Sequence, residues 1–414
     1  MSKDLKLEYY PGLNDDLLQV SINKIKENKS KWDQPFFFDT ESYLDLDNIN
    51  KTIKSLLSEE IKNVIVLGTG GSIQTLLALK HLAKKRIFPI TSSRAVELKG
   101  CLATTTPKNS IVIPISRGGE TLDVNSTIGT FWKAGYKFLG LSSTGTMNDI
   151  LREIDCPILE VPNLSGRYAG SVTNVAVVPA CIAGIKIEAF LKGLEMGYKS
   201  FSSLNKNNRA IEFSAYIYNL YKKNYKVIFS MPYSKNLEGS TGLWVQGISE
   251  STGKDEKGMI GTFQEAPICQ HSVLEYLLGG TKGVVIPILW TIEQEILNLD
   301  LTSSIDYVNG KSAQTIINYQ ADATFQALIQ QSVPSAKISI KDPTEESMGV
   351  LIAFILSSVY YLCLLIDVNW ANNPKVIIGK QICNKALKDN INTTKREKIR
   401  KNLAKEMFKH FFES

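Results

Sequence analysis

The chain has 414 residues, of which 43% are hydrophobic and 21% are charged, and its formal net charge is +6. This length exceeds one ordinary core and predicts about two to three domains, and the composition is that of an ordinary soluble globular protein. The six cysteines lack CxxC spacing and the three histidines are too few for a His-rich cluster, which argues against a metal site. The first residues, MSKDLKLEYY, carry charge where a secretory signal would have an apolar core, so we expect a cytoplasmic protein.

The first strong pattern begins at Asn63, in NVIVLGTGGSIQTLLALKHLAKK. It predicts an apolar strand, a glycine turn and then an amphipathic helix. Further strand-like runs follow at FPITS, SIVIPIS, KFLGLSS and PILEVP, separated by helix-length segments. Such alternation is typical of a parallel sheet with helices on both faces.

A second round of this pattern contains YKVIFSMP and GGTKGVVIPIL, and a polar segment that bears glycine and serine separates the two rounds. We therefore expect an α/β protein with two domains, each a mainly parallel sheet flanked by helices in three layers, and with helical arms at both ends. The expected parts are an N-terminal arm (1–50), a first domain (51–191), a connector (192–213), a second domain (214–383) and a basic C-terminal helical tail (384–414).

The segment 349–366 is uncharged over 18 residues, which is the lower edge of a membrane span. Polar groups interrupt it at Ser357, Ser358, Tyr360 and Tyr361. A helix buried on all sides in a large domain gives the same signal. We favour that interpretation and expect no membrane contact.

The charge is concentrated in the tail, where residues 384–414 contain nine Lys and Arg against four Asp and Glu. Ile399, Leu403, Met407 and Phe411 form an apolar stripe on this basic segment. Nucleic acid could bind such a face, but a solvated terminal helix that packs on its own protein or on a twin subunit is the preferred interpretation.

Two glycine turns follow strands of the first domain, where helix amino termini present free N–H groups to a ligand. The turn Gly68–Ser72, which includes Gly71 and Ser72, has Ile73 where a dinucleotide site would have a third glycine. The second turn offers Ser116, Arg117 and Thr121. Hydroxyls and backbone amides in two such turns suggest a monophosphate pocket without the lysine of a Walker loop.

Two other residues are candidates for chemistry. Arg167, in the glycine turn LSGRYAGSV, is suited to stabilise an oxyanion beside a phosphate pocket. Glu250 lies in WVQGISESTGKDEK, with Gln246 four residues before it and Gly253 behind it. The small polar residues around Glu250 are typical of a loop.

Seven motifs follow one another between residues 60 and 383: GTGGS, SRGGET, SGRYAGSV, QGISESTGK, ICQHSVLEYLLGG, DPTEESMGVLIA and VNWANNPKVIIGK. In this order they resemble the phosphoglucose isomerase family, which interconverts glucose 6-phosphate and fructose 6-phosphate. The resemblance implies two sugar-isomerase (SIS) domains.

The resemblance also implies a role for individual residues. Glu250 matches the catalytic base, Arg167 the arginine that steadies the enediolate, His271 the ring-opening histidine supplied by the partner subunit, and Lys380 the lysine that assists ring opening. The matched phosphate ligands are Ser72, Ser116 and Thr121, with Gly71 and Arg117 in the same turns. Gln246 matches a residue near the sugar, and Asp123 matches an acidic residue paired with the histidine.

The sequence departs from the family pattern at several positions. Ser165 replaces a glycine, Gly118 a hydroxyl residue, Asn373 a glutamine and Ile377 an acidic residue. The segment EAPIC replaces a Gly-Asn-Gly run before His271. We expect these changes to affect affinity or sugar preference more than reaction type.

The implied activity is the reversible aldose–ketose isomerisation of these two sugar phosphates in glycolysis and gluconeogenesis. It requires no cofactor and no metal, and the implied assembly is a homodimer with a shared active site that binds no nucleic acid. A non-catalytic SIS regulator that binds a sugar phosphate is the alternative function. Glucosamine 6-phosphate synthesis would need an amidotransferase domain with an amino-terminal cysteine, which the sequence does not contain.

Overall fold

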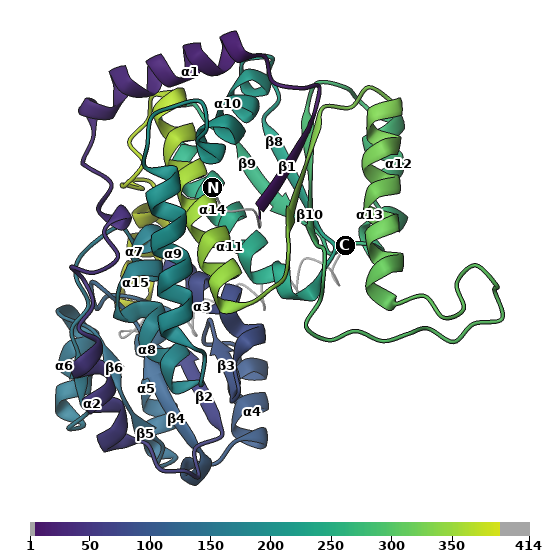
Figure 1. Cartoon of the computed structure of the whole chain (residues 1–414). Coiled ribbons are helices and arrows are strands. Elements are labelled where there is room, and N and C mark those ends of the chain that lie inside the picture. Colours follow the sequence, from purple (N-terminus) through teal and green to yellow (C-terminus); the bar gives the residue numbers. More distant parts are fainter. Residues whose placement is uncertain (1–4, 390–414) are drawn as a thin grey trace, which may run out of the picture. The chain divides into compact units, whose positions relative to one another are not determined.

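The computed structural model describes residues 5–389 (Figure 1). The chain forms two compact units, Met1–Ala371 and Asn372–Ser414. The three sheets found within residues 5–389 all belong to the first unit.

The first sheet is parallel and has the strand order β3-β2-β4-β5. Its strands are β2 (Asn63–Leu67), β3 (Arg86–Ile90), β4 (Ser110–Pro114) and β5 (Lys137–Phe138). A short parallel pair, β6 (Gly140–Leu141) and β7 (Ile158–Leu159), continues beside it through a bridge between Ile115 and Leu141.

Both faces of this sheet are covered, because alternate residues of a strand point to opposite faces. Val64 and Val66 of β2 pack in the cluster that contains helices α3 (Gln74–Leu79) and α8 (Asn174–Ile182). Ile65 and Leu67 pack in another cluster. That cluster contains residues of α4 (Ala95–Thr104), α5 (Leu122–Lys133) and α6 (Gly145–Glu153).

The second sheet has the order β1-β11-β10-β8-β9. Its strands are β1 (Leu5–Tyr10), β8 (Val227–Pro232), β9 (Ile260–Phe263), β10 (Val285–Ile292) and β11 (Ser335–Ile340). All neighbours are parallel except β1, which is antiparallel to β11.

Helices also flank the second sheet on both faces (Figure 1). Residues of α12 (Leu274–Gly279) and α13 (Ala313–Gln330) pack on one face, against Met231 and Leu289. The other face carries residues of α10 (Arg209–Lys222), α11 (Glu238–Thr252) and α14 (Glu345–Ile366). The prediction of mainly parallel sheets flanked by helices is confirmed.

The ends of the predicted parts differ in detail from the expectation. The N-terminal arm contains helices α1 (Asp15–Asn28) and α2 (Leu46–Leu56), but it begins with strand β1, which completes the distant second sheet. The segment predicted as a connector, 192–213, lies mostly in α9 (Ile187–Phe201) and α10. Its glycines are packing positions, because a Cβ on Gly193 would lie 2.0 Å from the carbonyl oxygen of Glu346 in α14. The division into domains stays a prediction.

Helix α14 contains the uncharged segment noted in the sequence. Within residues 5–389 it is the one helix long and apolar enough to cross a membrane, and that apolar stretch is completely buried inside the protein. Gly349 allows its close approach to α9, since a Cβ there would lie 2.3 Å from the carbonyl oxygen of Phe190. The interpretation as a buried core helix is therefore confirmed.

The second unit contains α15 (Val376–Asp389), which includes Lys380. The predicted tail begins inside this helix, at residue 384. Its apolar stripe, from Ile399 to Phe411, lies outside the described residues.

Candidate active site

The two predicted phosphate turns lie at the same edge of the first sheet. Gly68–Ser72 follows β2 and Ser116–Thr121 follows β4, and these strands are parallel neighbours with Leu67 opposite Pro114. Strand β3, which follows β2 in the chain, lies on one side of β2, and β4 lies on the other side. The strand order therefore reverses between β2 and β4, where the two turns lie. Open α/β sheets bind ligands at such a switch point, outside the carboxyl ends of the strands.

The second turn holds its hydroxyls close together. Ser116 Oγ lies 2.9 Å from Thr121 Oγ1, and Thr121 is the residue that precedes α5. Gly119 has a φ of +69°, and a Cβ there would lie 2.0 Å from the carbonyl oxygen of Thr144. Only glycine fits this position without a backbone shift.

The first turn packs against the segment that carries Arg167. A Cβ on Gly71 would lie 2.6 Å from the carbonyl carbon of Gly166, the first residue of α7 (Gly166–Val172). A Cβ on Gly166 would in turn lie 2.8 Å from Nη2 of Arg117. The absence of side chains at Gly71 and Gly166 therefore brings both turns and both arginines together.

Arg167 is buried, with only 4% of its side chain exposed. Its Nε donates to Ser251 Oγ at 3.0 Å and its Nη1 to Glu250 Oε2 at 3.0 Å. Its Nη2 donates to the carbonyl oxygens of Trp370 and Ala371 at 3.1 and 3.2 Å. The planar guanidinium is thus held in one orientation by a set of fixed acceptors.

Glu250 lies in the last turn of α11 and not in a loop, so the interpretation of its surroundings as a loop was wrong. The helix places Gln246 one turn before it on the same face, and Gln246 Nε2 donates to Glu250 Oε1 at 3.2 Å. The Glu250 side chain is 29% exposed, so one side of the carboxylate is open to a ligand. Small residues here serve close packing of the helix, because a Cβ on Gly247 would lie 3.0 Å from Val359 of α14.

The electrostatics of this cluster favour an anion. Burial lowers the pKa of Arg117, and the neighbouring Arg167 lowers it further. Burial also lowers the pKa of Lys254 to about 8, and Arg167 adds to this effect. Three cationic groups therefore interact with the carboxylate of Glu250, an excess that suits a phosphate or an enediolate.

The sequence analysis did not single out Lys254, which is only 9% exposed. Its position four residues after Glu250 was a usable signal, because the family motif ESTGK includes it. Its Nζ donates to the carbonyl oxygen of Asn369.

His271 and Asp123 are not part of this cluster. His271 ends the 3-10 helix Ile268–His271 and is exposed, and Asp123 is exposed in the first turn of α5. Within residues 5–389 no hydrogen bond or ion pair joins His271 to Glu250 or to Asp123. Lys380 belongs to the second unit, where it is exposed on α15. Their roles stay predictions.

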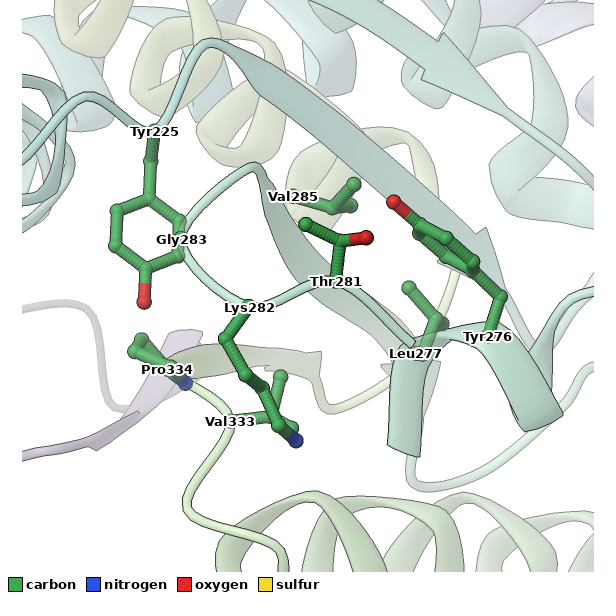
Figure 2. A pocket seen from close by; sticks show the side chains of 9 residues that line it. All are labelled: Tyr225, Tyr276, Leu277, Thr281, Lys282, Gly283, Val285, Val333 and Pro334. Carbon is green, nitrogen blue, oxygen red and sulfur yellow. The ribbon is translucent and has the colours of Figure 1, made fainter. Parts of the chain in front are cut away.

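A separate cavity lies at the amino ends of strands β8 and β10 of the second sheet (Figure 2). Its lining includes Tyr225, before β8, and Val285, the first residue of β10. Its volume of about 20 Å³ is close to the room that one water needs, so it is too small for a sugar phosphate.

No family model matches the chain. Curated relatives match almost its full length. The glucose-6-phosphate isomerase of Mycoplasmopsis pulmonis is 26% identical, with 91% of this chain and 97% of that protein covered. The enzyme of the same name from Fusobacterium nucleatum is 25% identical, with 90% and 93% covered.

Solved structures agree with the fold. A hypothetical protein from Thermus thermophilus superposes with a TM-score of 0.82 at 18% identity, over 92% of this chain and 99% of that one. A glucose-6-phosphate isomerase from Chlamydia trachomatis gives a TM-score of 0.76 at 16% identity, over 98% and 92%.

Two mainly parallel sheets, with an anion-favouring cluster at the switch point of the first, define a fold of the SIS type. The relatives matched along the chain make the assignment more specific, and they confirm the resemblance seen in the sequence. Along most of its length the chain is similar to glucose-6-phosphate isomerases.

Proposed function

We propose that this protein is a glucose-6-phosphate isomerase that interconverts glucose 6-phosphate and fructose 6-phosphate. One observation carries the proposal: a partly exposed carboxylate, Glu250, is paired with the buried Arg167 next to two hydroxyl-bearing turns at a switch point. Relatives of that name, matched over about nine-tenths of the chain, support it.

The reaction requires a base that removes a weakly acidic proton next to a carbonyl and returns it one carbon away. In our proposal Glu250 takes the proton from C2 of the open aldose, and the electron pair moves to the carbonyl oxygen to give a cis-enediolate. Glu250 then returns this proton to C1 while the proton of the C2 hydroxyl moves to O1, so that the carbonyl forms at C2 and gives the ketose. Arg167 stabilises the charge that develops on the oxygen.

Substrate binding is assigned to the remaining residues of the cluster. Ser72, Ser116, Thr121 and the backbone amides of the Gly71 turn would hold the phosphate, with Arg117 behind them. Gln246 has a buried carbonyl oxygen without a hydrogen-bond partner in the described part of the chain. A sugar hydroxyl would satisfy it.

Ring opening is assigned to His271 and Lys380, since the cyclic sugar has no carbonyl. The exposure of His271, away from Glu250, supports a homodimer in which this histidine reaches the site of the partner. We also propose that the protein acts in the cytoplasm, in glycolysis and gluconeogenesis.

The test is a coupled assay of the purified protein with fructose 6-phosphate, compared with mannose and amino-sugar phosphates. Turnover that is selective for fructose 6-phosphate is the expected result. Binding of fructose 6-phosphate without any turnover would instead identify the non-catalytic regulator.

A further inference from the structure

Three successive backbone carbonyls accept hydrogen bonds from the two buried cations of the site. Asn369 accepts from Lys254 Nζ, and the next two residues, Trp370 and Ala371, accept from Arg167 Nη2. These carbonyls belong to the segment 367–371, which follows α14 and is called the strap below.

The strap is fixed from its other side as well. The indole Nε1 of Trp370 donates to the carbonyl oxygen of Asp33 at 3.0 Å. The Trp370 ring packs edge to face on Tyr168, with centroids 4.8 Å apart. Ala371 N donates to Asn369 Oδ1 at 2.8 Å, which closes a tight turn inside the strap. A change at the Asn369 carbonyl therefore reaches the carbonyls of Trp370 and Ala371, which lie in the same turn.

We propose that Lys254 is a positioning residue, which fixes the strap at Asn369 so that the next two carbonyls hold Arg167 in the orientation needed for catalysis. The inference rests on the proposed function, because it assigns Arg167 to the enediolate. Without the ammonium group of Lys254, the Asn369 carbonyl loses its charged donor. The strap is then no longer held next to Trp370 and Ala371, whose carbonyls accept from Arg167. A guanidinium tilted away from Glu250 would stabilise the transition state less, while the phosphate turns would still bind substrate.

The charged and titratable groups around Lys254 come from three elements. Arg167 faces it from α7, Cys363 from α14, and Glu250 and Asp255 from α11 and the residues just after it. Because burial lowers the pKa of Lys254 to about 8, its charge is present at pH 7 and is lost at pH 9. The charge-assisted bond to the strap weakens over the same range.

The experiment compares three full-length variants by kinetics with fructose 6-phosphate and by hydrogen exchange of the peptide covering the strap. Lys254→Met removes the charge, and Lys254→Arg keeps it at every pH. Lys257→Met is the matched control, because the exposed Lys257 donates to the Asp367 carbonyl of the same strap at 3.1 Å.

We expect Lys254→Met to exchange faster in the strap and to lose about ten- to a hundredfold in kcat with little change in KM, the effect of a small misplacement of a catalytic group. Lys254→Arg should recover most of kcat and lose the fall in activity between pH 7 and 9. Lys257→Met should behave as wild type in both measurements.

Two outcomes would overturn the inference: unchanged strap exchange in Lys254→Met, or faster exchange with unchanged kcat. If Lys254→Met does not fold, Lys254→Arg decides. A loss of its activity between pH 7 and 9 identical to that of wild type would then count against the inference. A wild-type protein inactive on every sugar phosphate would refute the proposed function instead, and strap exchange in Lys254→Met would still decide whether the lysine fixes the strap.

Discussion

The pair of Glu250 and Arg167 shows how single residues are prepared for proton transfer. The carboxylate is partly open to solvent, whereas the guanidinium is buried and all three of its nitrogens donate to fixed oxygens. A rigid cation beside a reachable base suits a reaction in which negative charge appears on oxygen after proton removal.

Replacement of Glu250 by Gln tests the base directly. The amide keeps the size and the hydrogen bond to Arg167 but cannot accept the proton. Turnover should therefore fall by about two to four orders of magnitude, the usual contribution of a general base. A coupled assay measures turnover, and calorimetric titration with fructose 6-phosphate checks that binding persists. Retained turnover would remove Glu250 from its assigned role.

Gly71 tests the contact between the first turn and α7. Alanine there would place its Cβ 2.6 Å from backbone atoms of Gly166, which cannot rotate away as a side chain can. We expect Gly71→Ala to destabilise the fold by about 1–3 kcal/mol, as overpacking does, and to weaken binding of the sugar phosphate. Urea unfolding measures the stability.

The control for that change is Gly129→Ala. Gly129 lies inside α5 and has no atom within 4 Å of its added Cβ. Alanine should stabilise this helix by up to about 1 kcal/mol. Equal effects at both positions would show that the packing of Gly71 has no special importance.

At the scale of elements, His81 links the segment after α3 to the start of the core helix α14. It lies in the 3-10 turn after α3, and its Nε2 is 3.0 Å from the carbonyl oxygen of Pro343, just before α14. Burial lowers the pKa of His81, although the carbonyl and the carboxylates of Glu295 and Glu345 oppose this effect.

This pKa predicts a loss of stability in mild acid. The unfolded chain takes up the proton near the ordinary pKa of about 6.5, while the folded protein resists it. Stability should therefore fall as the pH drops from above 6.5 towards the lower folded pKa. His81→Gln, which can still donate to Pro343 but does not titrate, should reduce the difference in melting temperature between pH 7.5 and 5.5. An identical difference in wild type and variant would contradict the prediction.

The elements also show what the sequence could predict. Strands such as β2 and β4 are continuous apolar runs because both of their faces are covered, and that signal is local. Strand β1 was missed because its place depends on pairing with β11, more than 300 residues away. Helix α11 was misread because its glycines serve close packing, Gly239 on α3 and Gly247 on α14, which composition alone does not reveal.

At the scale of the whole molecule, the residues assigned to catalysis fall into separate groups. Arg167, Gln246 and Glu250 form one contact cluster within the first unit. The sequence motifs identified His271 and Lys380 by family resemblance, and the proposed function assigns His271 to the site of a second subunit. The shared site is therefore a question about the assembly.

Mixed dimers answer this question. In a dimer of one Glu250→Gln chain and one His271→Ala chain, a site built from both subunits would combine the two defects in one pocket and leave the other pocket intact. Such a dimer, isolated by two different affinity tags, should have about half the activity of wild type, although each parent is nearly inactive.

The matched control combines Glu250→Gln with Arg167→Lys. These two residues lie 3.0 Å apart in the same chain, so each site of that mixed dimer keeps one defect and neither should recover. Recovery in the first mixture and none in the second requires that His271 acts across the subunit boundary while Glu250 and Arg167 act together. Failure to isolate any doubly tagged species, or a first mixture as inactive as its parents, would exclude a shared site, and His271 would then have to act within its own chain or not at all.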